Sequence, residues 1–195
     1  TDASPTYKIG GSTDLNCFNS EVTVMRFTKM HGAGNDYVCI NCFEETVDNP
    51  AELAVKVSDR HFGVGADGLV LIVPSQAADF RMRMFNPDGT EAEMCGNAIR
   101  CVGKYVYDNN MTKKTRLNIE TLAGIKVLEL AANGGKVINV RVDMGEPILD
   151  PTRIPVSSDK ERVVSEPLNI DGDEHKVTCV SMGNPHAIIY TDSIE

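Results

Sequence analysis

Cys95 has the clearest chemical potential in this chain, because it directly precedes a segment with the pattern of a buried helix. The first turn of a helix has unpaired backbone N–H groups and the positive end of the helix dipole, and both favour an anion. A cysteine in that position is favoured as the thiolate. The N–H groups of Gly96 and Asn97 can hold a carboxylate near the sulfur, because glycine has no side chain to block the approach. This combination predicts acid–base or nucleophilic chemistry on an acid. The alternative is a small buried cysteine at the start of a core helix.

A predicted strand, turn and helix position this cysteine. Residues 80–85 alternate as a strand does, and Asn86-Pro87-Asp88-Gly89 is a typical turn sequence. The helix is predicted over Gly96–Asp108, where apolar side chains occupy nearly the whole circumference. A helix that is apolar on almost every side is buried. We therefore expect Cys95 to begin a core helix.

Composition limits the function classes. The chain has 195 residues, 42% of them hydrophobic, a formal net charge of −9 and six cysteines. No apolar run is long enough to span a bilayer, so we expect a soluble globular protein of one or two domains. The acidic charge and the lack of a basic cluster argue against a nucleic-acid or membrane partner. The cysteines favour reduced thiols in a cytoplasmic protein over a disulfide framework.

Three regions are predicted along the chain. Residues 1–24 are expected to be an N-terminal extension, because most of this stretch is polar without an apolar period. Residues 25–143 are the first domain, and residues 144–195 are part of a second. The expected elements are strands at 22–30, 37–41, 69–73, 80–85, 116–120, 125–130, 137–142, 166–169, 175–182 and 187–191, and helices at about 50–60 and 96–108.

Two motifs that suggest other chemistry do not fit their surroundings. Cys39-Ile40-Asn41-Cys42 matches a redox or zinc pattern, but Cys39 lies in a strand-like run and no second ligand pair has matching spacing. Residues 63–68 match the dinucleotide pattern G-x-G-x-x-G. That pattern needs a strand before the glycines and a helix after them, whereas here the order is reversed. We therefore expect neither a metal nor a nucleotide cofactor.

Four separate segments make the chain resemble the diaminopimelate epimerase family. The resemblance implies an α+β fold in which a mostly antiparallel mixed sheet wraps around a central buried helix. It also implies two pseudo-repeated domains, of which the second is incomplete here, and the similar settings of Gly34-Asn35 and Gly183-Asn184 between strands agree with such a repeat. The four segments are Gly32-Ala33-Gly34-Asn35-Asp36, Phe85-Asn86-Pro87-Asp88-Gly89, Met94-Cys95-Gly96-Asn97 and Ser181-Met182-Gly183-Asn184-Pro185-His186.

The resemblance also implies roles for individual residues. Cys95 is expected to be one of two cysteines that transfer protons at an α-carbon, without pyridoxal phosphate or metal. His186 is expected to help orient the reacting thiols. Taken from the residues alone, Asn35, Asn184 and His186 are also explained as turn residues. The substrate-binding residues implied are Asn35, Asn86, Gly96, Asn97 and Asn184.

The reaction implied is epimerisation of diaminopimelate from the LL to the meso form, in lysine biosynthesis. The second cysteine is expected in a glycine-rich turn of the second domain, and no such turn occurs before Glu195. The chain alone is therefore expected to lack half of the active site. A racemase of the proline or hydroxyproline type and a non-catalytic fragment with the same fold are the alternatives. We expect a small amino-acid substrate and, as oligomeric state, a homodimer.

Overall fold

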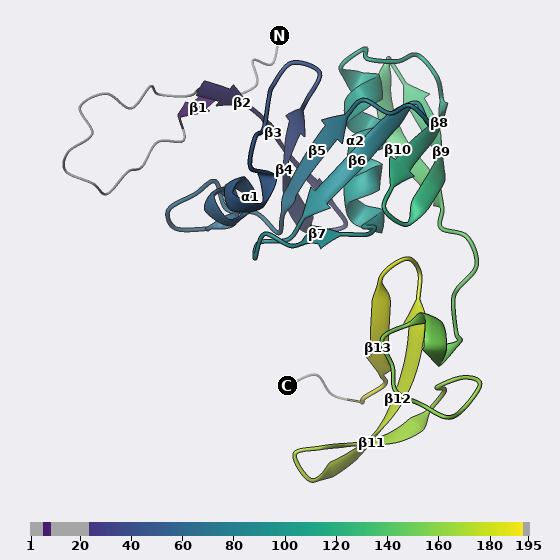
Figure 1. Cartoon of the computed structure of the whole chain (residues 1–195). Helices are drawn as coiled ribbons and strands as arrows, with labels where there is room; N and C mark the ends of the chain where they lie inside the picture. Colours follow the sequence, from purple (N-terminus) through teal and green to yellow (C-terminus); the bar gives the residue numbers. More distant parts are fainter. Residues whose placement is uncertain (1–5, 9–23, 193–195) are drawn as a thin grey trace, which may run out of the picture. The chain divides into compact units, whose positions relative to one another are not determined.

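The computed structural model describes residues 6–8 and 24–192, which divide into two compact units, Thr1–Asp143 and Met144–Glu195 (Figure 1). Most of the predicted N-terminal extension lies outside the described residues. Within it, Thr6–Lys8 (β1) pairs antiparallel with Val24–Arg26 (β2), a pairing that the sequence pattern did not predict. Each unit is described by itself.

An eight-stranded mixed sheet dominates the first unit. Its strand order is β10-β9-β8-β6-β5-β4-β3, and β7 pairs with β6 at one end. Only the pairs β4/β5 and β6/β8 are parallel, which confirms the mostly antiparallel mixed sheet expected from the sequence. The strands are β3 (Thr28–Gly32), β4 (Asn35–Asn41), β5 (Leu69–Val73), β6 (Phe80–Phe85), β7 (Glu91–Ala92), β8 (Arg116–Thr121), β9 (Gly124–Asn133) and β10 (Lys136–Asp143).

β4 and β5 are buried and largely apolar on both faces, as expected for strands that are covered on both sides. One face packs against α1 (Pro50–Ser58), which begins with Asn49 as its cap: the Asn49 side chain accepts a hydrogen bond from the backbone N–H of Glu52. The apolar cluster on this face contains Phe27, Val38, Ile40, Ala54, Val57, Ala66, Leu69, Leu71 and Phe85.

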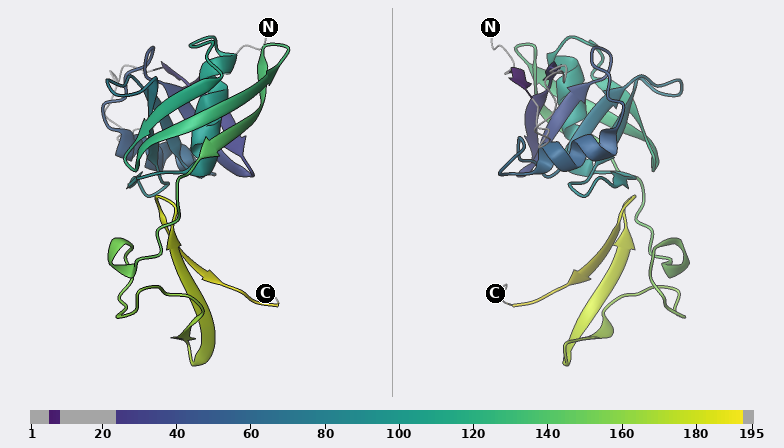
Figure 2. Two further views of the ribbon diagram at one scale, coloured as in Figure 1. Left: turned by 90° about the vertical axis from the view of Figure 1, so that its right-hand side faces the viewer. Right: turned by 60° about the vertical axis from the view of Figure 1, so that its left-hand side comes forward.

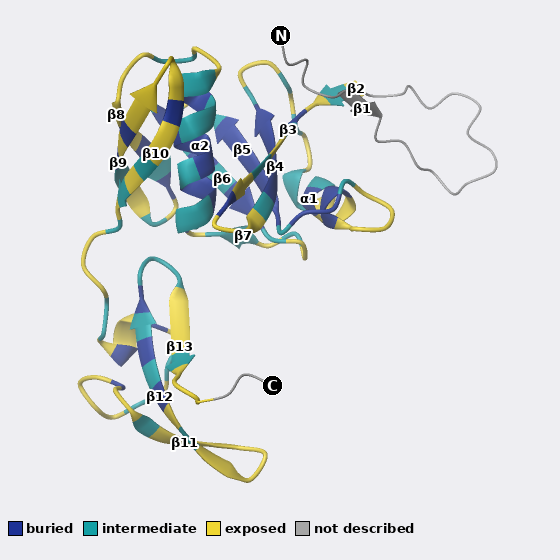
Figure 3. Ribbon diagram, turned by 180° about the vertical axis from the view of Figure 1, so that it is seen from behind, coloured by how far each residue is buried: buried dark blue, intermediate teal, exposed yellow. Residues whose placement is uncertain are grey.

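The other face of the sheet curves around α2 (Gly96–Asp108), which contacts β3, β4, β6, β9 and β10. No residue of α2 is exposed, and Figure 3 shows only buried and intermediate residues along the helix. In the two views of Figure 2, strands lie on more than one side of α2. This arrangement confirms the sequence-based prediction of a core helix inside a curved sheet.

Most predicted element boundaries are shifted in the structure, and two of the differences have a clear physical cause. The strand expected over 22–30 is interrupted at Phe27, whose side chain turns into the apolar cluster beside α1. The helix expected to reach Arg60 ends at Ser58. Asp59 leaves the helical conformation, and its carboxylate accepts hydrogen bonds from the backbone N–H groups of His61 and Phe62, both at 2.7 Å. Arg60 is thereby released from the helix.

The second unit contains a three-stranded antiparallel sheet with the order β11-β12-β13. A short 3-10 turn, Pro151–Arg153, precedes it, and the part of this unit that the structure describes has no α-helix. Its apolar core is formed by Ile154, Val163, Val177 and Cys179. The strands are β11 (Glu166–Ile170), β12 (Asp173–Ser181) and β13 (Pro185–Ile189).

A Gly32→Ala substitution is predicted to destabilise the first unit. A Cβ at position 32 would lie 2.6 Å from the backbone oxygen of Asn97, in the first turn of α2. Because a backbone atom cannot turn aside as a flexible side chain can, β3 and α2 must separate, at a cost of about 1–3 kcal/mol in the free energy of unfolding. Urea unfolding measures this cost.

Gly34→Ala is the matched control for this substitution. A Cβ at position 34 would meet no atom within 4 Å, so only its φ of +94° opposes the change. We expect about 1 kcal/mol for that backbone strain. If Gly32→Ala is no less stable than the parent chain, the first turn of α2 is not held against β3 as described.

Candidate active site

The residues that the sequence singles out in the first unit gather at one end of the sheet. β4 and β5 run parallel, whereas β6 runs antiparallel to β5, so the starts of β4 and β5 lie at the same end as the close of β6. Asn35 begins β4, and Asn86 directly follows β6. The first turn of α2 lies against the end of β3, as the approach of Asn97 to Gly32 shows. Asn35 of β4 is thus brought together with Cys95 and Asn97, which lie at the start of α2.

The backbone on both sides of Cys95 is fixed. Met94 is 1% exposed, and the carbonyl of Glu93 accepts a hydrogen bond from the Ala123 N–H at 3.1 Å. Cys95 itself is extended, with φ −141° and ψ 112°, and is the N-cap of α2. Its carbonyl accepts the Ile99 N–H at 3.0 Å, which closes the first helical turn. The amides of Gly96 and Asn97 lie in that turn, where no carbonyl of the helix can accept from them.

A buried tyrosine contacts the sulfur of Cys95. The hydroxyl of Tyr37 lies 3.2 Å from Sγ of Cys95, and Tyr37 is 2% exposed. Burial, followed by the hydrogen bond to Cys95, raises the pKa of Tyr37 far above its usual value. The hydroxyl therefore stays protonated near neutral pH, so it can donate a hydrogen bond to a thiolate.

Two asparagines form an amide pair beside this cysteine. Nδ2 of Asn97 donates to Oδ1 of Asn35 at 2.5 Å, and Nδ2 of Asn35 donates to the Asp67 carboxylate at 3.2 Å. Arg100 donates to Oδ1 of Asn97. The orientation of each amide follows from this network, because a carboxylate can only accept and a guanidinium can only donate. One N–H of each asparagine amide is left to meet a ligand.

An ionic cluster holds the turn that carries Asp67 against the start of β4. Arg60 lies 2.8 Å from Asp36 and 2.8 Å from Asp67, and Lys29 lies 2.7 Å from Asp36. Hydrogen bonds from Arg60 and then Lys29 hold the pKa of Asp36 well below its usual range. The Asp67 carboxylate also accepts the backbone N–H of Asp36 at 3.0 Å. This cluster fixes the acceptor that orients Asn35.

Asn86 has a different setting from the other candidate residues. Its backbone N–H donates to the Thr90 carbonyl at 2.8 Å, and its side-chain Nδ2 donates to Oγ1 of Thr90 at 3.0 Å. These bonds close the turn from β6 to β7, which Arg83 and Glu91 reinforce with a two-pronged ion pair. In this structure Asn86 therefore stabilises the turn, and its role as a substrate contact stays a prediction.

Asn184 and His186 belong to the second unit. Asn184 lies in the turn after β12, where Gly183 has a φ of +104°, and His186 is the second residue of β13. Nε2 of His186 lies 3.2 Å from Oδ1 of Asn184, and His186 is exposed on β13. The structure thus brings these two residues together where the turn meets β13. Their roles at the substrate stay predictions.

The other described cysteines are in settings unlike that of Cys95. Cys39 is 1% exposed in β4, and burial raises its pKa far above the usual value. Burial also raises the pKa of Cys101 to about 11 and that of Cys42 above its usual value. Cys179 is buried in β12. Cys17 lies outside the described residues. In the motif Cys39-Ile40-Asn41-Cys42, Cys39 lies within β4, as predicted, and Cys42 directly follows that strand.

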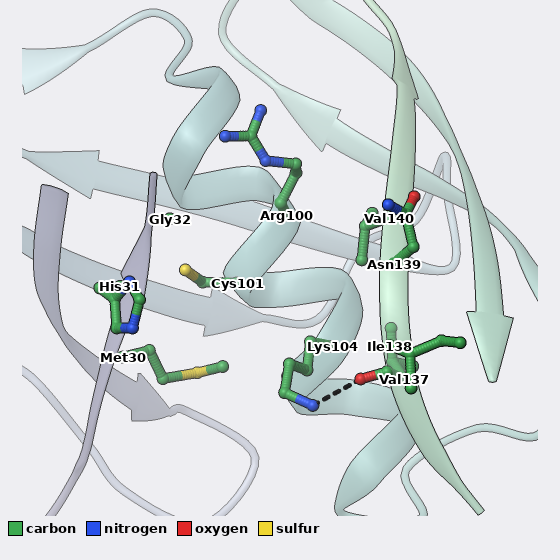
Figure 4. Close-up of a pocket in the computed structure, with 10 residues that line it drawn as sticks. All are labelled: Met30, His31, Gly32, Arg100, Cys101, Lys104, Val137, Ile138, Asn139 and Val140. Atoms are coloured by element: carbon green, nitrogen blue, oxygen red, sulfur yellow. Dashed lines mark hydrogen bonds between the residues drawn. The ribbon is translucent and has the colours of Figure 1, made fainter. Parts of the chain in front are cut away.

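A pocket lies beside α2, between the outermost strands β3 and β10 (Figure 4). Arg100 and Lys104 of α2 line it, and Lys104 donates to the Val137 carbonyl at 2.7 Å. Cys101 also lines this pocket, whereas Cys95 does not.

Among the described residues no group of three or more histidine, cysteine and acidic side chains is arranged to hold a metal ion. None of the described helices is long and apolar enough to cross a membrane.

Sequence reasoning missed three residues of this site, Tyr37, Asp67 and Arg100. The signal for Tyr37 was its spacing: it is two residues after Asn35 in a strand, so both side chains lie on one face. Arg100 follows Asn97 by three residues in a helix, a spacing that brings side chains together. Asp67 had no local signal, because its partner Asn35 is 32 residues away.

Comparison with known proteins places these features in a family. The family model described as "Diaminopimelate epimerase" matches residues 27–149. A protein named diaminopimelate epimerase from Acetivibrio thermocellus is 70% identical over 171 residues, which are 88% of this chain and 61% of that protein. One of the same name from Methanococcus maripaludis is 60% identical over 171 residues, 88% of this chain and 62% of that protein. The chain thus spans about three fifths of the length of these relatives.

Solved structures show the same fold at low sequence identity. A hydroxyproline epimerase from Agrobacterium vitis, crystallised with trans-4-hydroxy-L-proline, has a TM-score of 0.63. It is 14% identical, and the match covers 84% of this chain and 50% of the other. A similarity at this level concerns the fold alone.

Among the described cysteines, Cys95 is predicted to react first with iodoacetamide at neutral pH. The thiolate is the nucleophile, and burial keeps Cys39 and Cys101 in their thiol form. Brief labelling followed by peptide mapping measures each cysteine separately. Cys42→Ser is the control, because removing this half-buried thiol should leave the labelling rate of Cys95 unchanged. Faster labelling of Cys39 or Cys42 would contradict the assignment.

Proposed function

Because the chain belongs to the diaminopimelate epimerase family, we propose that it supplies the Cys95 half of an active site that epimerises diaminopimelate. The reaction proposed inverts one α-carbon, from the LL to the meso form, as a step of lysine biosynthesis. The match to the family model over residues 27–149 and the 70% identity to the relative from Acetivibrio thermocellus support this substrate. As an enzyme of amino-acid synthesis, it would act in the cytoplasm.

One observation carries the proposal: Sγ of Cys95 sits at the N-terminus of a buried helix, 3.2 Å from a hydroxyl that stays protonated. The helix N-terminus and the hydroxyl place hydrogen-bond donors around the sulfur, and the thiolate of a cysteine is the form that can remove a proton. The amide pair of Asn35 and Asn97 lies beside it, with N–H groups that suit a carboxylate. A base next to a carboxylate cradle is what proton removal at an α-carbon needs.

In the proposed reaction the Cys95 thiolate takes the α-proton and becomes a thiol. The electron pair of the broken C–H bond moves toward the α-carboxylate, where the amides of Gly96 and Asn97 stabilise the negative charge that develops. A proton then returns to the α-carbon from the opposite face. The carbon is inverted, and the proton taken by Cys95 balances the one delivered.

The opposite face needs its own proton donor, because a single thiol can only return a proton to the face from which it took one. Cys39, Cys101 and Cys179 are buried, and Cys42 directly follows β4. We therefore propose that the second thiol comes from the part of the relatives' length that this chain does not span. Asn184 and His186 are proposed to serve that second half of the site, and Asn86 to contact the substrate beside β6.

The test uses the chain extended at its C-terminus by the remaining sequence of the Acetivibrio thermocellus relative. Incubated with pure LL-diaminopimelate in deuterium oxide, this protein should form the meso isomer with deuterium at the α-carbon, followed by NMR. The unextended chain should not invert the substrate. Absence of both inversion and deuterium uptake in the extended, folded protein would contradict the proposed function.

Two variants of the extended protein locate the base. Cys95→Ser should lower the rate of inversion by about 10²–10⁴-fold, because a hydroxyl is a far weaker acid than a thiol. Cys42→Ser should leave the rate unchanged, since this thiol has no part in the proposed site. Equal losses in the two variants would show that Cys95 has no special role.

A further inference from the structure

We propose that Tyr37 is a positioning residue whose hydroxyl donates a hydrogen bond to the Cys95 thiolate and keeps that thiolate available as the base. This inference deepens the proposed function and rests on it for the identity of the base. Its central contact, the 3.2 Å between the Tyr37 hydroxyl and Sγ of Cys95, is a feature of the fold alone.

The position of Tyr37 leaves its hydroxyl little choice of partner. Tyr37 is the third residue of β4, and its side chain lies on the same face as Cys39, toward α2. It is 2% exposed, so solvent does not satisfy the hydroxyl. Within the described residues its only side-chain hydrogen bond is to Cys95. A buried hydroxyl without a partner is costly, so this contact also helps to hold Cys95 in place.

The direction of donation follows from which proton is held more tightly. Burial, then the bond to Cys95, then the charges of Cys101 and Asp67 all raise the pKa of Tyr37. Because the phenol keeps its proton, it must be the donor whenever the sulfur is a thiolate. When Cys95 is a thiol, the same oxygen can accept from the S–H group. The pair therefore stays hydrogen-bonded through both protonation states of the reaction.

The charged groups around the pair do not replace this donor. Arg100, on the next turn of α2, donates to Asn97 and acts on Cys101. Asp67 is held by Arg60 and Asn35. In the proposed reaction the backbone N–H groups of Gly96 and Asn97 bind the substrate carboxylate. These donors are therefore not available to the sulfur of Cys95 alone. Tyr37 is then the donor kept for the sulfur alone.

The test is the pH dependence of Cys95 alkylation in Tyr37→Phe. This variant keeps the ring and removes only the hydroxyl, so the core should remain filled. We expect the pH–rate profile for labelling of Cys95 by iodoacetamide to move about one pH unit higher, which is roughly a tenfold loss of rate below its midpoint. A profile identical to that of the parent chain would overturn the proposal.

Tyr107→Phe is the matched control. Tyr107 is in α2, the helix that begins directly after Cys95. Within the described residues its hydroxyl has no hydrogen-bond partner. Its loss should leave the alkylation profile in place. Labelling of Cys39, which is buried in the folded chain, reports unfolding in either variant. If Tyr37→Phe shifts the Cys95 profile while Cys39 stays protected, the shift is not a consequence of unfolding.

The measurement separates this inference from the proposed function, because alkylation needs neither diaminopimelate nor a second thiol. A shifted profile in a protein that fails to epimerise diaminopimelate would support Tyr37 and contradict the function. In an active extended protein, Tyr37→Phe should lower kcat on the low-pH side and leave KM nearly unchanged. A change in KM alone would overturn the assignment of Tyr37 to the sulfur.

Discussion

The close contact between a curved sheet and a helix without an exposed face underlies every feature of the first unit. α2 has no residue that is fully exposed, because strands from distant parts of the chain pack against it. Little space remains around this helix. A Cβ added at Gly103 would press against Leu128, and one added at Gly32 would press against the backbone of Asn97. The same enclosure fixes the first turn of α2, and with it Cys95, against the end of the sheet.

Local patterns predicted the elements well because their causes are local. The alternation in Phe80–Phe85 and the apolar circumference of Gly96–Asp108 gave both elements with the boundaries found in the structure. The break at Phe27 was not predictable in the same way, because it depends on a core formed by residues far along the chain. The short strand β7 was missed, since two residues cannot show a period.

The residues of the candidate site also differ in whether a local sequence pattern indicates them. Cys95 could be found from its place before the helix, and Asn35 and Asn97 from the segments that resemble the family. Asp67 meets its partner across 32 residues of sequence, so no local pattern indicates it, and the spacing of Tyr37 from Asn35 indicates a shared face but not the contact with Cys95, 58 residues away. The sequence therefore does not predict how the side chains of the site are oriented. It does not show which atom of each asparagine amide donates or accepts within the network, or which hydroxyl lies against the sulfur of Cys95.

The sequence separations within the site have a kinetic consequence. The Asn35–Asn97 bond spans 62 residues, and the Tyr37–Cys95 contact spans 58. Closing loops of this length costs conformational entropy, and contacts of such large sequence separation slow folding. A chain still being made, or one partly unfolded, has the cysteine without its surroundings. The hydrogen bond between Tyr37 and that sulfur is thus a property of the finished fold alone.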